Sequence, residues 1–143
     1  MSFRFVTPVR FGDIDHAGII YFPRFFHMFH VAFEEMWRAR LGPRGYADLL
    51  DRERIGLPAV HASCDFKAPL RFGDTIELEL TVARLGAKSI TFHHRVYRTD
   101  GEDRTLCADG QVVTAAVDMT RFASVAVPER IVALLQDLVE PPT

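Results

Sequence analysis

Cysteine is scarce in this chain, and the thiols that are present have no obvious partner. Only Cys64 and Cys107 occur among 143 residues, and both lie in apolar, strand-like runs without an adjacent base. A disulfide framework or a zinc site needs more cysteines at closer spacing. We therefore expect no disulfide, no metal site and no thiol nucleophile, and a reducing cytoplasm is the expected compartment.

An excess of one charge sign and long apolar runs are also missing. Lys and Arg number 17 against 19 Asp and Glu, which leaves a net charge of −2. Without a broad basic field, nucleic acid is not an expected partner. No apolar stretch approaches the ~20 residues of a membrane span, and MSFRFVTPVRF alternates charged and apolar residues where a signal peptide has an unbroken apolar core. Neither membrane insertion nor secretion is expected.

The composition that remains is that of a globular domain. Hydrophobic residues make up 48% of the chain and charged residues 25%, which is too apolar for intrinsic disorder. No repeat, low-complexity tract or long linker divides the sequence. Residues 1–143 are therefore expected to form a single domain with one core.

One long helix is predicted over residues 23–41. Pro23 suits the first helical position, no Gly or Pro interrupts the run, and Gly42-Pro43 ends it. The segment is apolar on most sides, so a large surface must cover it. Its narrow polar stripe, at i, i+3, i+4 spacing, consists of His27, His30, Glu34 and Arg38.

Alternating apolar and polar residues predict strands around this helix. Pro8 places the first strand, over residues 3–10, at a sheet edge, and Gly110 indicates a bulge or a close backbone approach in the last strand. Consecutive hairpin connections are expected between the later strands, and a short helix begins at Val127-Pro128-Glu129. The pattern predicts an α+β fold, a curved antiparallel sheet wrapped around one long central helix. The later strands are expected at residues 57–68, 75–85, 89–97 and 104–118.

The irregular segment from Phe11 to Phe22 is the strongest candidate for chemistry. It places Asp13 and Asp15 directly before the helix, whose first N–H groups are unpaired and carry the positive end of the helix dipole. Such donors suit the oxyanion of an attacked carbonyl, and a nearby carboxylate can act as nucleophile or general base. An Asp before a helix can equally be a cap or a turn former. Spacing alone leaves both interpretations open.

The run RFGDIDHAGIIYFPRFF resembles the D-x-D-x-x-G-[IV]-[IV]-[YWF] segment of the 4-hydroxybenzoyl-CoA thioesterase family, which has the hotdog fold. The resemblance continues through GLPAVHASCDFKAPLRFGD at 56–74 and ARLGAKSITFHHRVY at 83–97. The aromatic-Pro ending, Phe22-Pro23, is closer to the hydroxybenzoyl-CoA branch than to the Tol-Pal-associated branch, where a histidine follows the tyrosine.

This resemblance implies acyl-CoA thioester hydrolysis without a metal or cofactor. The carboxylate of Asp15 would be the nucleophile or general base, and the backbone N–H of Phe22, in the loop turned at Gly18, would polarise the thioester carbonyl. Tyr21 and Phe25 are the expected contacts to an acyl group that we expect to be aromatic.

Further substrate contacts are expected on the strands. His61 would line the acyl pocket; the alternative is that it is an ordinary strand histidine with its polar groups satisfied and no contact to a substrate. Arg84, Lys88 and Ser89 match the stretch that binds the coenzyme A phosphates in the family, and Arg121 is a further candidate; each could also be a solvated surface residue. The resemblance also implies a homodimer with sites at the subunit boundary, commonly paired again into a homotetramer.

Several rival interpretations use the same residues. His27, His30 and Glu34 could converge on a metal, but a polar stripe facing solvent or a subunit interface explains them as well. Glu34 or Glu35 could be the catalytic carboxylate, as in another hotdog branch. At the level of function, the alternative is a non-catalytic hotdog module that binds acyl-CoA or an aromatic ligand. A hotdog dehydratase is disfavoured because its histidine signatures are missing from the loop.

Overall fold

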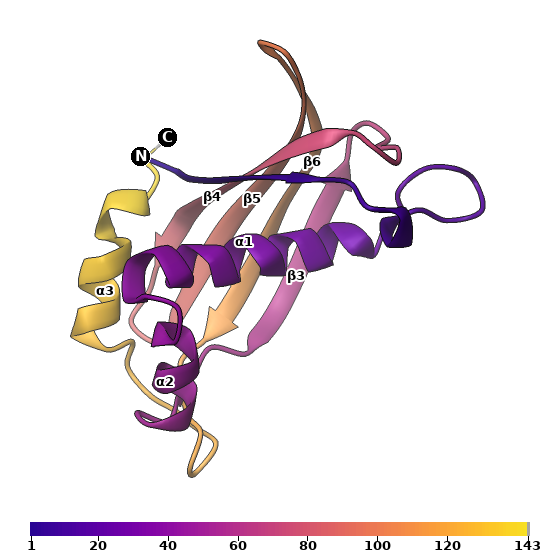
Figure 1. Cartoon of the computed structure of the whole chain (residues 1–143). Coiled ribbons are helices and arrows are strands. Elements are labelled where there is room, and N and C mark those ends of the chain that lie inside the picture. The colour runs from indigo at the N-terminus through magenta and orange to yellow at the C-terminus, as the bar shows by residue number, and fades with distance from the viewer. Residues whose placement is uncertain (143) are drawn as a thin grey trace.

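A five-stranded antiparallel sheet forms the body of the protein. The computed structural model describes residues 1–142. The strands lie in the order β1-β4-β5-β6-β3, so that β1 and β3 are the two edges. In Figure 1 the sheet curves beneath helix α1. The strands are β1 (Phe3–Pro8), β3 (Ala59–Phe66), β4 (Thr75–Leu85), β5 (Ser89–Asp100) and β6 (Asp103–Ala115).

A second, very small sheet and the helices complete the fold. The small sheet joins β2 (Ile55–Gly56), β7 (Val117–Asp118) and β8 (Ala123–Ser124). It lies at the same end of the molecule as α2 (Figure 1). The helices are α1 (Arg24–Leu41), α2 (Gly45–Asp51) and α3 (Glu129–Leu135), with short 3₁₀ turns at Phe11–Asp13 and Gln136–Leu138. No helix within residues 1–142 is long and apolar enough to cross a membrane.

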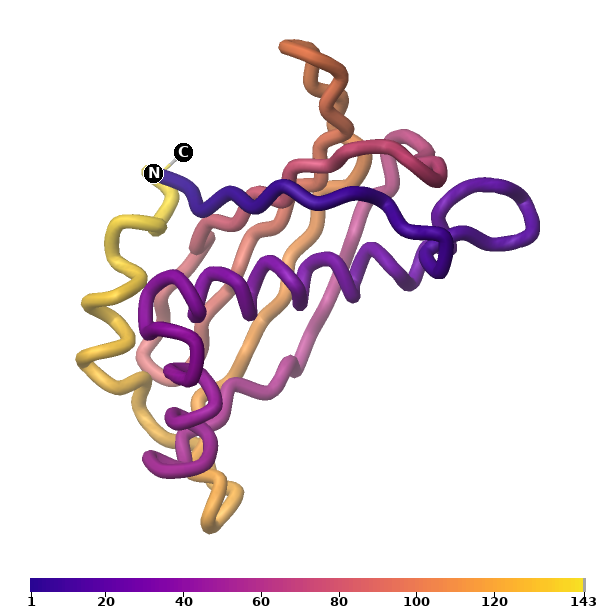
Figure 2. Tube along the Cα trace, viewed as in Figure 1, coloured from indigo at the N-terminus to yellow at the C-terminus, as the bar shows by residue number. Residues whose placement is uncertain are grey.

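Helix α1 packs across one face of the main sheet (Figures 1 and 2). It has 18 residues, and Gly42 ends it with a φ of +88°, a conformation that suits glycine. The predicted polar stripe is exposed, which confirms its position. Because the sheet covers the opposite side, Met36 and Trp37 have no exposed surface. The buried residues of α1 are Phe25, Met28, Phe29, Ala32, Phe33, Met36 and Trp37.

The strand connections differ from the prediction in one important respect. Only β4, β5 and β6 form consecutive hairpins, whereas β3 crosses the sheet and pairs with β6 at the far edge. The reason is that β1 already occupies the free edge of β4, with Phe3 opposite Leu80. The predicted last strand is also divided, because its end leaves the main sheet to pair with β2 and β8. Helix α2 was not predicted.

Gly110 allows a close approach between the sheet and α1, as one of the two sequence interpretations predicted. A Cβ atom at this position would lie 2.6 Å from the Ser63 carbonyl oxygen and 2.6 Å from Cε2 of Phe29. The register shifts of the main sheet lie elsewhere, between Ala59 and His61, between Val82 and Arg84 and between Val96 and Tyr97. The absence of a side chain at Gly110 therefore determines where Phe29 sits.

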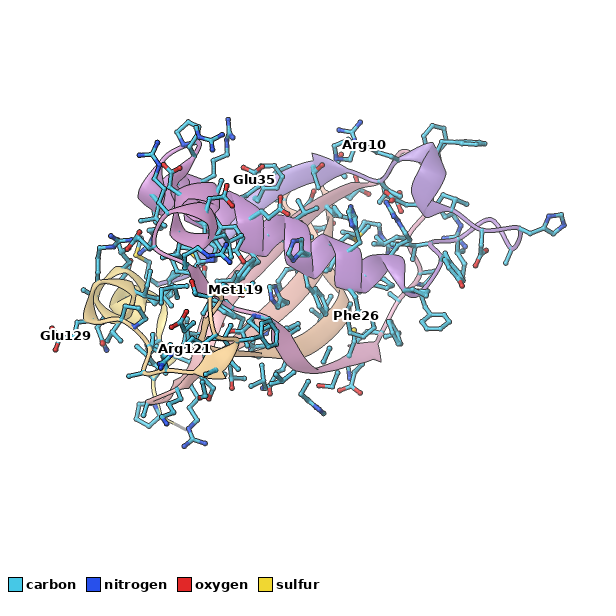
Figure 3. All side chains as sticks on the ribbon, turned by 90° about the horizontal axis from the view of Figure 1, so that it is seen from below. Arg10, Phe26, Glu35, Met119, Arg121 and Glu129 are labelled. Atoms are coloured by element: carbon cyan, nitrogen blue, oxygen red, sulfur yellow. The ribbon has the colours of Figure 1, made fainter. Side chains whose placement is uncertain are left out.

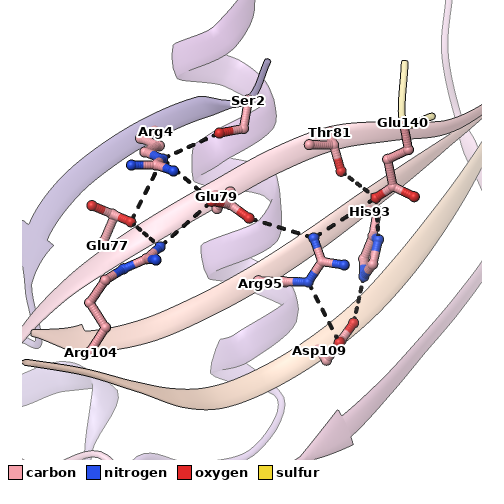
Figure 4. A network of polar contacts seen from close by, with 10 residues as sticks. All are labelled: Ser2, Arg4, Glu77, Glu79, Thr81, His93, Arg95, Arg104, Asp109 and Glu140. Carbon is pink, nitrogen blue, oxygen red and sulfur yellow. Dashed lines mark hydrogen bonds and ion pairs between the residues drawn. The ribbon is translucent and has the colours of Figure 1, made fainter. Parts of the chain in front are cut away.

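The face of the sheet away from α1 carries a polar network that holds the C-terminal segment (Figure 4). His93 contacts Glu140 through Nδ1 at 2.5 Å and Asp109 through Nε2 at 2.6 Å. The hydroxyl of Thr81 donates a hydrogen bond to Glu140 at 2.6 Å. The Glu140 backbone N–H also donates to the Val82 carbonyl at 2.8 Å. Side-chain and backbone contacts thus tie this segment to β4 and β5.

Candidate active site

Asp13, the first aspartate of the motif, is a structural residue. It is buried, and its Oδ1 accepts hydrogen bonds from Arg24 Nε at 3.0 Å and Nη2 at 2.8 Å. Its Oδ2 accepts the Arg10 backbone N–H at 2.9 Å, and its carbonyl accepts the Tyr21 N–H at 2.9 Å. The carboxylate and carbonyl oxygens of Asp13 together tie both ends of the loop to the start of α1. The structure therefore removes Asp13 from the candidates for direct chemistry.

Asp15 lies on the exposed part of the same loop, which stands out beyond the N-terminus of α1 (Figure 2). Its Oδ1 accepts the Ala17 N–H at 2.8 Å, and its carbonyl accepts the Gly18 N–H at 3.0 Å. Gly18 has a φ of +83°, which this tight turn requires and most side chains disfavour. No group within residues 1–142 bonds Oδ2 of Asp15, so this oxygen is available to a reacting group.

An unpaired N–H group lies at the start of α1, as predicted. The Tyr21 N–H donates to Asp13, the Arg24 N–H donates to the Tyr21 carbonyl at 2.8 Å, and Pro23 has no N–H. Within the described chain the Phe22 N–H has no acceptor, and it lies where the positive end of the helix dipole is strongest. The loop therefore presents both an exposed carboxylate and an unpaired N–H donor.

An aromatic cavity of about 410 Å³ lies beside α1, between that helix, α2 and the edge strand β3. Figure 3 marks two of its walls, Phe26 from α1 and Met119 from the turn between β7 and β8. The volume is within the ~300–1,000 Å³ range of small-molecule pockets. Its aromatic walls are Phe26, Phe29, Phe33, Tyr46, Phe92 and Phe122.

The predicted acyl contacts do not line this cavity in a single chain. Tyr21 is half exposed on the loop, and His61 is exposed on β3. Phe25 is only 3% exposed and packs on Phe66 at the end of β3, with ring centroids 5.5 Å apart, so it belongs to the core. The sequence signal that could have located the cavity is Phe26. It is a large apolar residue of α1 that lies to one side of the buried face of the helix.

Buried His94 is the polar residue that the sequence reasoning did not assign to the site. Because it is next to His93 on β5, His94 faces the opposite side of the sheet, and it lies against Phe29, with ring centroids 4.7 Å apart and nearly parallel planes. Burial, followed by the charges of His93 and His30, lowers the pKa of His94 to about 3. His94 is therefore a neutral imidazole in the cavity wall at physiological pH.

The helix carboxylate Glu34 lies close to the cavity. It pairs with His30 at 2.8 Å. Burial, followed by the charge of Glu34, raises the pKa of Tyr46, another cavity residue. No group of three or more His, Cys, Asp and Glu side chains in residues 1–142 is arranged to hold a metal ion.

The predicted coenzyme A residues lie at the opposite end of the sheet from Asp15. Pro8, close to the loop, pairs with Thr75 at the start of β4, whereas Arg84 is near the end of that strand. Ten strand residues span roughly 30 Å. Arg84 and Lys88 are exposed at the β4–β5 turn, with Ser89 partly buried beside them. A single chain therefore does not bring Asp15 to these residues.

A curved antiparallel sheet packed on one helix, with a carboxylate loop at the start of that helix, defines a protein of the hotdog class. More specifically, the chain belongs to the Thioesterase-like superfamily, whose family model matches residues 9–135. This membership confirms the prediction of a thioester hydrolase.

Comparisons with individual relatives, in sequence and in structure, agree with this membership. The chain is 30% identical over 135 residues to a 1,4-dihydroxy-2-naphthoyl-CoA hydrolase of Synechococcus elongatus, covering 94% of this chain and 96% of the relative. A 1,4-dihydroxy-2-naphthoyl-CoA thioesterase from Synechocystis superposes with a TM-score of 0.84 at 26% identity, covering 99% of this chain and 100% of the other. A 4-hydroxybenzoyl CoA thioesterase, at 22% identity and a TM-score of 0.84 over 94% of this chain and 98% of the other, shares the fold.

Proposed function

We propose that this protein hydrolyses an aromatic acyl-CoA, of the hydroxybenzoyl or naphthoyl kind, to the free acid and coenzyme A. The observation that carries the proposal is one loop holding both the exposed carboxylate of Asp15 and the unpaired N–H of Phe22. The aromatic walls of the cavity favour a flat acyl group over a flexible chain. The names of the relatives support the same substrate class.

The loop geometry supports two routes that use the same atoms. In the first, an Asp15 oxygen attacks the thioester carbon, the C–S bond breaks with departure of the thiolate, and water then hydrolyses the mixed anhydride. In the second, Asp15 accepts a proton from the water molecule that attacks the thioester. In both, the Phe22 N–H stabilises the oxyanion. A single turnover in ¹⁸O-labelled water detects the first route when water attacks the aspartyl carbon of the anhydride, because ¹⁸O then enters the Asp15 carboxylate. The second route places ¹⁸O only in the released acid.

A second copy of the chain supplies the rest of the site in this proposal. Strand β3 is an edge with almost all of its residues exposed, so it can pair with the β3 strand of another copy. Two-fold pairing is antiparallel and reverses the direction of the partner's α1. The Asp15 loop of one copy then meets the end of the partner at which the cavity and the β4–β5 turn lie.

This homodimer gives the predicted substrate residues their roles. Arg84, Lys88 and Ser89 bind the nucleotide phosphates from the subunit opposite the attacking Asp15. Tyr21 contacts the acyl group beside the thioester, and His61 lies on the edge strand at the subunit boundary. Pairing of two such dimers would give the homotetramer.

Thiol release from a panel of aromatic and straight-chain acyl-CoAs tests the activity. Asp15→Asn should lower kcat by ~10²–10⁴-fold without changing the melting temperature. Asp51→Asn, an exposed acid on α2, is the matched control and should retain full activity. Loss of activity in Glu34→Gln but not in Asp15→Asn would transfer the catalytic role to the helix carboxylate. Binding of acyl-CoA without hydrolysis would indicate the non-catalytic module.

Complementation tests the shared site. Leu50→Trp would fill the cavity from α2, away from the β3 edge. Neither this variant nor Asp15→Asn has an intact site in its own homodimer. Mixed dimers have one intact site, so an equal mixture that is allowed to exchange subunits should regain roughly a quarter of wild-type activity. No recovery, with subunit exchange verified, would place the whole site in one chain.

A further inference from the structure

His94 has hydrogen-bonding capacity that the described chain leaves unused. It is 2% exposed and lines the aromatic cavity. No group within residues 1–142 bonds either ring nitrogen, and Nδ1 is sealed from solvent. Buried polar groups in native proteins are normally paired, so an unpaired one in a cavity wall indicates a ligand.

The two ring nitrogens of His94 are not equivalent. Nδ1 is enclosed, whereas Nε2 is not sealed, and because His94 lines the cavity, Nε2 is the nitrogen open to a ligand there. A neutral imidazole carries one proton. An orphaned buried N–H is rarer than an orphaned acceptor, so the proton belongs on Nε2. His94 therefore presents an N–H donor to the cavity.

The surrounding residues hold this donor in place. The Phe29 ring stacks on the imidazole, and Phe29 is itself packed against Gly110, where a Cβ would lie 2.6 Å from its Cε2. The Thr114 hydroxyl, also in the cavity wall, donates to the Ile90 carbonyl at 3.4 Å, which leaves its oxygen able to accept a hydrogen bond. One fixed donor and one acceptor thus lie within otherwise aromatic walls.

We propose that His94 determines substrate specificity by donating an Nε2–H hydrogen bond to an oxygen substituent on the aromatic ring of the acyl group. This inference rests on the proposed function and narrows its substrate to hydroxylated or oxo-substituted aromatic acyl-CoAs. An unsubstituted ring fits the aromatic walls but leaves the donor unpaired, which costs binding energy. A polar site of this kind therefore rejects the analogue that lacks the oxygen.

The test compares kcat/KM for benzoyl-CoA with that for its 2-, 3- and 4-hydroxy derivatives. In the wild type, at least one hydroxy isomer should be preferred by ~10–100-fold. His94→Phe keeps the stacking on Phe29 but removes the donor, so the preference should fall to within ~3-fold, chiefly through a lower kcat/KM for the preferred hydroxy isomer. His94→Gln restores an N–H and should recover part of the preference. An equal loss on all four substrates in both variants would overturn the inference, as would a wild type without preference.

A control and a binding measurement separate this inference from the proposed function. His27→Phe removes an exposed imidazole of α1 outside the cavity and should leave the preference unchanged. If no acyl-CoA is hydrolysed, the proposed catalysis fails, and calorimetric titration with benzoate and the three hydroxybenzoates tests the inference alone. Tighter binding of a hydroxy acid that is lost in His94→Phe supports it; equal binding of all four acids overturns it.

Discussion

Replacement of Asp13 by Ala should weaken both the fold and the activity, although Asp13 is buried and its carboxylate is already bonded to Arg24 and Arg10. The substitution removes the acceptor of two Arg24 hydrogen bonds and one Arg10 N–H. Breaking a fully buried ion pair costs ~3–5 kcal/mol. The Arg24 side chain is 37% exposed, so water can solvate the freed guanidinium, and we expect about 2 kcal/mol.

Scanning calorimetry and thiol-release kinetics measure the two effects. At ~2–4 °C per kcal/mol for a chain of this size, the melting temperature should fall by roughly 4–8 °C. Because Asp13 also accepts the Tyr21 N–H through its backbone, the loop keeps part of its shape, and kcat should fall by about 10-fold through misplacement of Asp15. The melting temperature and kcat of Asp13→Asn should lie between those of the wild type and those of Asp13→Ala. If Asp13→Ala matches the wild type in melting temperature and kcat, the loop does not depend on this ion pair.

Three further predictions concern the core and the polar network. Gly110→Ala should destabilise the fold by ~1–3 kcal/mol in urea unfolding, because the new methyl group displaces Phe29; unchanged stability would refute the close approach. Met36→Ala, at a position without exposed surface, should cost ~2–5 kcal/mol in the same assay. Burial raises the pKa of Glu140, but hydrogen bonds, including one with His93, lower it more, so the net shift is downward. Ionised Glu140 therefore stabilises the fold fully above pH 4.5, its ordinary pKa, and this stabilisation is lost as the pH falls through the depressed pKa. In calorimetry, the difference in melting temperature between wild type and Glu140→Gln should be full at pH 7 and vanish in strong acid.

Local sequence signals were sufficient for most of the secondary structure and for the loop that carries Asp15. Apolar spacing between Pro23 and Gly42 specified α1, and strict alternation specified β4 and β5, because periodicity is a property of neighbouring residues. The turn at Gly18 and the position of Asp15 before the helix were also readable, because both depend on a few consecutive residues. Asp13 could not be separated from Asp15 in this way, since its role depends on burial beside Arg24.

Only the tertiary structure decided which strands meet and where a cavity forms. The placement of β3 beside β6 follows from β1 occupying the edge of β4, a pairing between segments about 70 residues apart. The cavity has walls from α1, α2, β3, β5 and β6, and the unpaired donor of His94 depends on what surrounds it. The sequence by itself therefore determined the elements and the Asp15 loop, because these are local. Strand order, burial and the aromatic cavity depend on long-range packing, which no local pattern encodes.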